Sequence, residues 1–187
     1  MQRQARHPLG FTLIELMMTI AIATILLTLG LPSIGSMVSS SESRAARQQL
    51  WTALNVARAG AVTDNRRHVV CPSIDQVNCS GGLRWDKGWI VFVDNNENGR
   101  RDGSDAVISV GNPARQGVVI ASTVGRDQVG FRTDGSSAGS NATFTICDRR
   151  GVSTATSLVV SNPGRVRSGT PTSTAAEQTC ALLASGA

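Results

Sequence analysis

The feature that most constrains this chain is a long apolar run close to its N-terminus. Residues 11–31 are 21 consecutive, predominantly apolar residues, and Glu15 is the only charged residue among them. A helix of this length rises about 30 Å, which is the thickness of the hydrocarbon core of a bilayer. Residues 1–10 are polar and basic, and the cationic flank of a membrane span stays on the cytoplasmic side. The pattern therefore predicts a single-pass membrane anchor with all later residues outside the cytoplasm.

A secretory signal peptide is the alternative interpretation of this run. Such signals have an apolar stretch of about 7 to 15 residues, followed by a small-residue cleavage site. Here the run is longer and the small residue, Gly10, precedes it, so cleavage after Gly10 would leave the helix on the mature protein. A carboxylate inside a membrane span needs a partner. The new amine of Phe11 in one subunit would be available to Glu15 of a neighbour.

The chain beyond the apolar run divides into a helix and a β-rich head. Residues 33–63 keep a helical period, with an apolar stripe at Ala46, Leu50, Leu54, Ala57 and Ala61. Pro32 removes a helical hydrogen bond and is expected to kink the rod. The stripe predicts a contact with the core of the head, whereas Arg44, Arg47 and Arg58 are expected to remain solvated.

Short strands separated by turns follow residue 66. Segments rich in β-branched and aromatic residues alternate with clusters of Gly, Asn, Asp and Ser. The expected strands cover residues 68–71, 88–93, 106–110, 118–123, 129–132, 142–147 and 157–160. One long helix that leads into an antiparallel sheet is an α+β fold, with the sheet packed on the amphipathic half of the helix. We therefore predict an anchor over residues 11–31, an amphipathic helix over 32–65 and a head over 66–187.

Four cysteines lie in the predicted head, at positions 71, 79, 147 and 180. A location outside the cytoplasm permits disulfides, and four cysteines allow three pairings. We favour Cys71–Cys79 and Cys147–Cys180, because sequential pairing closes short loops and the second bond would hold the C-terminal tail. A zinc site is the competing interpretation, but the spacing has no C-x-x-C pair.

A possible calcium loop follows the expected strand 88–93. Side chains with oxygen ligands occur there at the spacing of an EF-hand loop, namely Asp94, Asn96, Asn98 and Asp105. Two arginines within the loop would repel a cation, and a strand rather than a helix comes next. We favour a long hairpin turn, whose Asn, Asp and Gly residues tolerate left-handed backbone geometry, and predict no bound metal or cofactor.

Apolar residues make up 41% and charged residues 17%, which excludes a disordered chain, a collagen and a coiled-coil rod.

No group of residues in the sequence forms a recognisable catalytic site. There is no H-E-x-x-H, and His68 is the only histidine after residue 10. We predict that the protein is not an enzyme.

A basic turn near the C-terminus is the candidate binding feature. Arg165 and Arg167 are two residues apart, so in an extended segment their side chains point to the same side. Two guanidinium groups on one face suit the phosphates of a DNA backbone, and Arg149 and Arg150 are candidates to extend the patch. The alternative is a solvated hairpin edge whose charges prevent strand pairing. Composition alone favours this alternative.

The N-terminal residues resemble a known signal. The string Gly10-Phe11-Thr12-Leu13-Ile14-Glu15-Leu16 is similar to the class III signal of type IV pilins and type II secretion pseudopilins. The resemblance implies that residues 1–10 are a leader, which a prepilin peptidase removes after Gly10, and that Phe11 is then N-methylated. It also implies that Glu15 supports the addition of subunits to a filament.

Two further segments resemble the GspH/FimT group of these pilins. They are residues 85–94, which read W-D-K-G-W-I-V-F-V-D, and the Asn/Gly/Asp-rich loop 96–105. In addition, residues 164–167 match the G-R-x-R signature of the FimT members, which bind DNA in natural transformation. This resemblance implies that Arg165 and Arg167 contact DNA and that Gly164 permits the turn.

The sequence thus predicts a minor pilin that is made in the inner membrane with a periplasmic head and then enters a pilus at the cell surface. Its expected partners are other pilins, the prepilin peptidase and double-stranded DNA. Two alternatives remain: a minor pseudopilin of type II secretion without a DNA role, and a purely structural minor pilin that primes assembly.

Overall fold

The structure is a computed structural model that describes residues 10–184, without the side chains of residues 27–33. Most of the predicted leader, residues 1–9, and part of the predicted anchor lie outside this description. The chain forms two compact units that divide between Met37 and Val38. Among the described residues, the structure has no helix with both the length and the apolarity needed to cross a bilayer.

One helix, α1 (Leu13–Thr63), extends through both units. It covers the region of the predicted anchor and of the predicted amphipathic helix, and its assignment is continuous across Pro32. Because the second unit begins at Val38, the later part of α1 belongs to the head. In that unit the predicted apolar stripe is buried, at Ala46, Leu50, Leu54, Ala57 and Ala61.

The head is built from short strands and two helical segments that follow α1. The strands are β1 (Arg67–Pro72), β2 (Trp89–Asp94), β3 (Val107–Gly111), β4 (Val118–Ser122), β5 (Val129–Phe131), β6 (Ala142–Asp148), β7 (Thr156–Val160) and β8 (Val166–Gly169). The helical segments are the 3-10 turn η1 (Val152–Thr154) and α2 (Ser173–Ala184). The first seven strands lie where the sequence predicts them, whereas β8 and α2 were not predicted.

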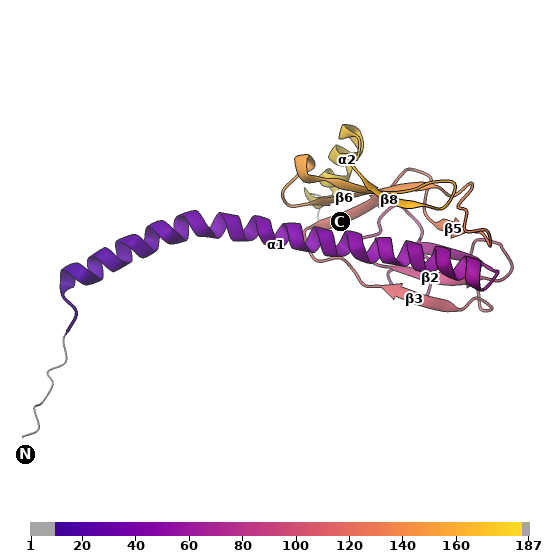
Figure 1. Ribbon diagram of the computed structural model, residues 1–187, viewed down its shortest axis with the longest axis horizontal. Helices are drawn as coiled ribbons and strands as arrows, with labels where there is room; N and C mark the ends of the chain where they lie inside the picture. The colour runs from indigo at the N-terminus through magenta and orange to yellow at the C-terminus, as the bar shows by residue number, and fades with distance from the viewer. Residues whose placement is uncertain (1–9, 185–187) are drawn as a thin grey trace, which may run out of the picture. The chain divides into compact units, whose positions relative to one another are not determined.

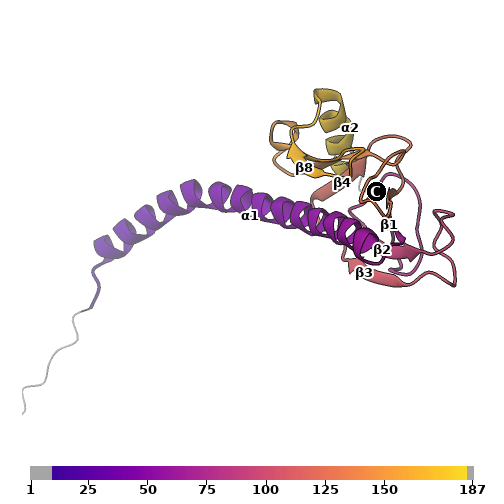
Figure 2. The ribbon, with the colours of Figure 1, turned by 45° about the vertical axis from the view of Figure 1, so that its right-hand side comes forward.

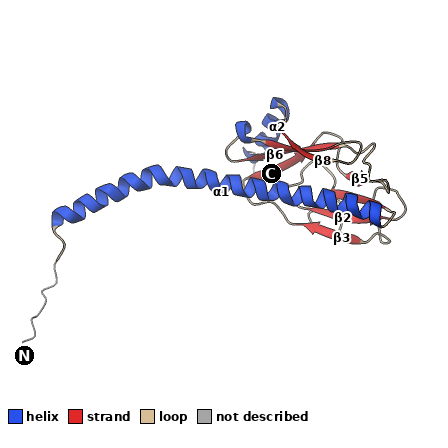
Figure 3. Cartoon of the chain, in the orientation of Figure 1, coloured by secondary structure: helices blue, strands red, loops and turns tan. Residues whose placement is uncertain are grey.

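Residues 38–184 form two four-stranded antiparallel sheets, where the sequence predicts one. Their strand orders are β3-β2-β1-β5 and β4-β6-β7-β8. The chain leaves the first sheet to form β4, returns for β5 and leaves again for β6, so neighbouring strands are often distant in sequence. Figures 1 and 3 show the later part of α1 running along the strands of both sheets.

The main core lies between the buried stripe of α1 and the inner faces of the two sheets. Trp85, which precedes β2, packs edge to face on Phe144 of β6, with ring centroids 4.8 Å apart. This geometry is the one that aromatic pairs prefer. The contact joins the first half of the head to the second sheet.

Two disulfides hold the outer parts of the head, and both pairs are those favoured from the sequence. Cys71 at the end of β1 bonds Cys79, and Cys147 of β6 bonds Cys180 of α2. Figures 1 and 2 show α2 on the side of the second sheet that faces away from α1. The second bond therefore fixes α2 to the outer face of that sheet.

Candidate nucleic-acid interface

The basic segment forms the turn of the β7–β8 hairpin and the start of β8. The N–H of Gly164 donates to the carbonyl oxygen of Ser161 at 2.7 Å, and the N–H of Ser161 donates to the carbonyl oxygen of Arg165 at 3.1 Å. The strands then pair in regular antiparallel register, with Val159 opposite Arg167. The turn is therefore closed by backbone hydrogen bonds on both sides.

Both arginines of the turn point away from the core. Val166 lies between them and packs against the core cluster, so the residues on either side of it face outward, as alternation along a strand requires. The side chains of Arg165 and Arg167 are exposed. Their Cα atoms are separated by about 7 Å, which is two residues of an extended strand. The structure thus presents two guanidinium groups on one face.

Gly164 sits at a point where no side chain fits. Its φ is +75°, and a Cβ atom at this position would overlap the carbonyl oxygen of Gly135. The N–H of Ser137 also donates to the carbonyl oxygen of Asn162 at 2.8 Å. The turn is therefore pressed against the loop that follows β5.

Arg58 of α1 holds the same two loops together. Its Nε donates to the carbonyl oxygen of Gly135 at 3.0 Å, and its Nη2 donates to that of Pro163 at 3.4 Å. Arg58 was expected to remain solvated, but its half-buried guanidinium instead contacts two loops. The stripe pattern gives no signal for such a contact, because both acceptors are backbone carbonyls from distant loops.

The structure does not bring Arg149 and Arg150 to this turn. They follow β6, whose other end, at Ala142, pairs with Val160 beside the turn. Six residues of strand separate the two ends, or about 20 Å. Arg150 is instead paired with the buried Asp148, with Nη2 and Oδ2 2.7 Å apart. The prediction that these arginines extend the patch is therefore not supported by their position.

The Asp148–Arg150 pair is a structural feature of the opposite end of the sheet. Burial raises the pKa of the Asp148 carboxyl, but hydrogen bonds from Arg150 and Ser43 and the charge of Arg150 lower it more, so that its pKa lies below the ordinary value. Arg150 thus stabilises a buried carboxylate and has a task other than ligand binding.

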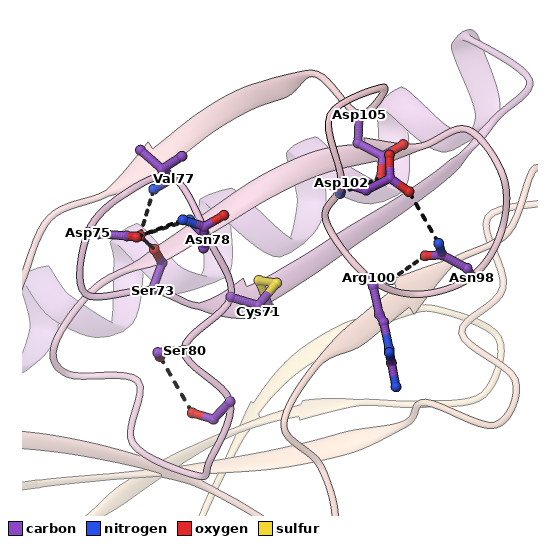
Figure 4. Close-up of a disulfide and its surroundings, with 12 residues drawn as sticks. Cys71, Ser73, Asp75, Val77, Asn78, Ser80, Asn98, Arg100, Asp102 and Asp105 are labelled. Atoms are coloured by element: carbon purple, nitrogen blue, oxygen red, sulfur yellow. Dashed lines mark hydrogen bonds between the residues drawn. A yellow bond between two sulfur atoms is a disulfide. The ribbon is translucent and has the colours of Figure 1, made fainter.

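The loop 94–105 uses its carboxylates for its own hydrogen bonds. Asp94 accepts from the N–H groups of Asn98 and Gly99, at 3.1 and 2.9 Å, and its carboxylate lies 3.4 Å from Arg67. Asp105 accepts from the N–H groups of residues 95 and 102. Figure 4 shows the contacts of Asp102 and Asn98 inside this loop.

These bonds bear on the calcium candidates Asp94, Asn96, Asn98 and Asp105. The described part of the chain contains no group of three His, Cys, Asp or Glu residues placed to hold a metal ion. The oxygen atoms that an EF-hand would direct at a cation instead accept backbone N–H groups. The geometry is that of the hairpin turn favoured from the sequence.

The N-terminal signal residues lie at the start of α1. Gly10 and Phe11 precede the helix and are exposed, and Glu15 lies in its first turn. The N–H of Glu15 donates to the hydroxyl of Thr12 at 3.4 Å, so the Thr12 side chain caps the first turn of the helix. This cap was not predicted, although a threonine at the start of the apolar run signals it.

An exposed apolar helix that continues into a disulfide-bonded, two-sheet head is the architecture of a type IV pilin-like subunit. Residues 46–164 match the family model "Type II transport protein GspH", and residues 6–31 match the "Prokaryotic N-terminal methylation motif". The first match covers more than half of the chain, and the chain therefore belongs to the GspH family of minor pilins and pseudopilins.

Crystal structures of one minor pilin show the same fold. Two crystal forms of the type IV minor pilin FimU of Pseudomonas aeruginosa match with TM-scores of 0.54 and 0.56 at 20% identity, covering 73% and 77% of this chain and 98% of theirs. The minor pseudopilin EpsH of the Vibrio cholerae type 2 secretion system matches with a TM-score of 0.49 at 12% identity, over 70% of this chain and 98% of its own. A comparison with curated protein sequences gave no match.

Proposed function

We propose that this protein is a minor pilin of a type IV pilus and that it binds double-stranded DNA through the turn Gly164–Arg167. The observation that carries the proposal is the exposed pair Arg165 and Arg167 on one face of a turn that Arg58 and Gly135 hold in place. Membership of the GspH family and the FimU-like fold support the pilin part of the proposal.

The proposed maturation follows the N-terminal signal. A prepilin peptidase removes residues 1–10, and the new N-terminus, Phe11, is methylated. The subunit remains in the inner membrane, anchored by residues 11–31, and its head lies in the periplasm. It then joins other pilins in the filament. Exposed apolar side chains between Phe11 and Leu26 are available for both environments.

The contact with DNA is expected to be made to phosphates. Residues 161–169 contain no aromatic side chain that could stack on a base. Arg165 and Arg167 lie along the edge strand of a sheet, and not on a helix or strand pair that could enter a DNA groove and contact the bases. Contacts to phosphate fix position without reading sequence. Binding of this kind releases counterions and weakens steeply with salt.

Titration of fluorescent DNA duplexes with the full-length protein in non-ionic detergent tests the proposal. Two duplexes of unrelated sequence are expected to bind with equal affinity. Each phosphate contact makes the slope of log K, the association constant, against log salt concentration more negative by about 0.9. Two contacts therefore give a slope of about −1.8 or steeper. The lack of binding at the lowest salt concentration would refute the DNA role, and would leave a pseudopilin or a purely structural pilin.

Glu15→Ala and Glu15→Gln are expected to keep leader cleavage but block incorporation into pili. Glutamine keeps nearly the size of glutamate and removes the charge that would pair with Phe11 of a neighbouring subunit. The mature mass in membranes and immunoblots of sheared pili measure the two steps. If Glu15→Gln enters pili normally while Glu15→Ala does not, the side chain acts without its charge, and the proposed pairing is wrong.

A further inference from the structure

A groove on the outer face of the second sheet lies directly beside the basic turn. Its volume is about 430 Å³, and it is lined by Thr123, Arg126, Asn141, Thr143, Val159 and Asn162 among others. Val159 is the strand partner of Arg167, and Asn162 belongs to the turn itself. The groove therefore begins where the Arg165–Arg167 pair ends.

Arg126 lies on the far side of this groove, after β4. Its Nη1 donates to the carbonyl oxygen of Gly139 at 2.9 Å, and its Nη2 lies 3.5 Å from Oδ1 of Asn141. β4 and β8 are the two edges of the sheet, so three strand spacings, or about 14 Å, separate them. Hydrogen bonds thus fix the Arg126 guanidinium at one edge of the sheet, and Arg165 and Arg167 lie at the other edge.

The chemistry of the groove suits a phosphate chain. Its lining has one guanidinium, several hydroxyl and amide groups, and no carboxylate. The larger neighbouring cavity, of about 490 Å³, shares Arg126 with the groove but is lined by Glu97 and Asp127 as well. Because carboxylates repel phosphates, the groove is the better path for a polyanion.

The C-terminal helix α2 covers the outer face of the second sheet on the side away from the turn. It is bonded to Cys147, near the end of β6 that lies away from the turn, and Figure 2 shows it above β4 and β8. A long ligand that contacts Arg165 and Arg167 is therefore kept from running along the strands. It can cross them through the groove at the end of the sheet nearest the turn.

We infer that a DNA duplex crosses the outer face of the second sheet from the Arg165–Arg167 pair to Arg126, which binds a further phosphate. The inference rests on the proposed function and extends it from a point contact to a defined path. A DNA strand rises about 3.4 Å per nucleotide, so 14 Å corresponds to about four nucleotides. Three phosphate contacts instead of two steepen the expected salt slope from about −1.8 to about −2.7.

Salt titrations of full-length Arg126→Ala in non-ionic detergent, with the duplexes used above, test this path. The variant is expected to bind DNA about tenfold more weakly, with a salt slope reduced by about one. Arg126→Lys, which keeps the charge, is expected to restore the slope. The matched control is Arg132→Ala, an exposed arginine outside the groove, which should bind as the wild type does.

If Arg126→Ala lowers the melting temperature, a second pair of variants tests whether DNA passes through the groove. Thr143 is partly exposed in the lining of the groove, and Thr143→Glu should bind at least tenfold more weakly than Thr143→Gln, which has the same size without the charge. If Arg126→Ala keeps the wild-type slope, or if the two Thr143 variants bind equally, the path is wrong although the protein binds DNA. If the wild type fails to bind DNA, the proposed function itself fails.

Discussion

Alanine in place of both Arg165 and Arg167 is expected to abolish DNA binding at physiological salt without lowering the melting temperature. Both side chains are exposed and face away from the core, so their removal leaves the packing of Val166 unchanged. Each lost phosphate contact reduces the salt slope by about one. The double variant should therefore lose about two from the slope and on the order of 100-fold in affinity at low salt.

The matched control is the double variant Arg100→Ala/Arg115→Ala. These arginines are also exposed, and their removal changes the net charge of the protein by the same amount. Equal loss of binding in the two double variants would show that only net charge matters and would contradict a specific role for the turn. Wild-type binding by Arg165→Ala/Arg167→Ala would remove the turn from the interface altogether.

Much of the fold could be predicted from local patterns. The stripe on α1 repeats at helical spacing, and all five of its residues are buried. The first seven strands are dense in β-branched residues and bounded by turn residues, so their positions follow from the sequence within one or two residues. The division into two sheets does not, because it depends on which distant strands pair, as β1 does with β5.

The two elements that were missed are short and have weak local signals. β8 contains only Val-Arg-Ser-Gly and has one residue packed against the core. α2 begins in a Ser/Thr-rich stretch that is typical of loops, and the signal that could have found it is the cap, where the N–H of Ala175 donates to the hydroxyl of Thr172 at 3.3 Å. Tertiary contacts, including the disulfide from Cys180, stabilise both elements.

The candidate site also has features that follow from local sequence and features that depend on tertiary contacts. The alternation of Arg165 and Arg167 is a local property, and it placed both side chains on one face. Arg58, the crowding of Gly164 and the distance to Arg149 depend on loops that meet only in the folded head. No spacing rule in the sequence connects residues that far apart.

Gly164→Ala is expected to destabilise the head by about 3 kcal/mol and to weaken DNA binding although no charge is removed. A non-glycine residue at positive φ costs about 1 kcal/mol, and the overlap with the carbonyl oxygen of Gly135 adds about 2 kcal/mol, as overpacking does. For a head of this size the melting temperature should fall by about 10 °C, measured by circular dichroism in detergent.

The control variant Gly81→Ala separates the backbone cost of a positive φ from the cost of the overlap with Gly135. Gly81 has a similar φ, +67°, but no atom lies within 4 Å of the position of its Cβ, so only the backbone cost of about 1 kcal/mol applies. If both variants melt alike, the contact with Gly135 does not constrain the turn. If Gly164→Ala melts lower yet binds DNA as the wild type does, the two arginines act as mobile charges. Loss of affinity in a folded Gly164→Ala protein would instead show that the phosphates require the fixed spacing that the turn imposes, because a flexible pair must lose conformational entropy on binding.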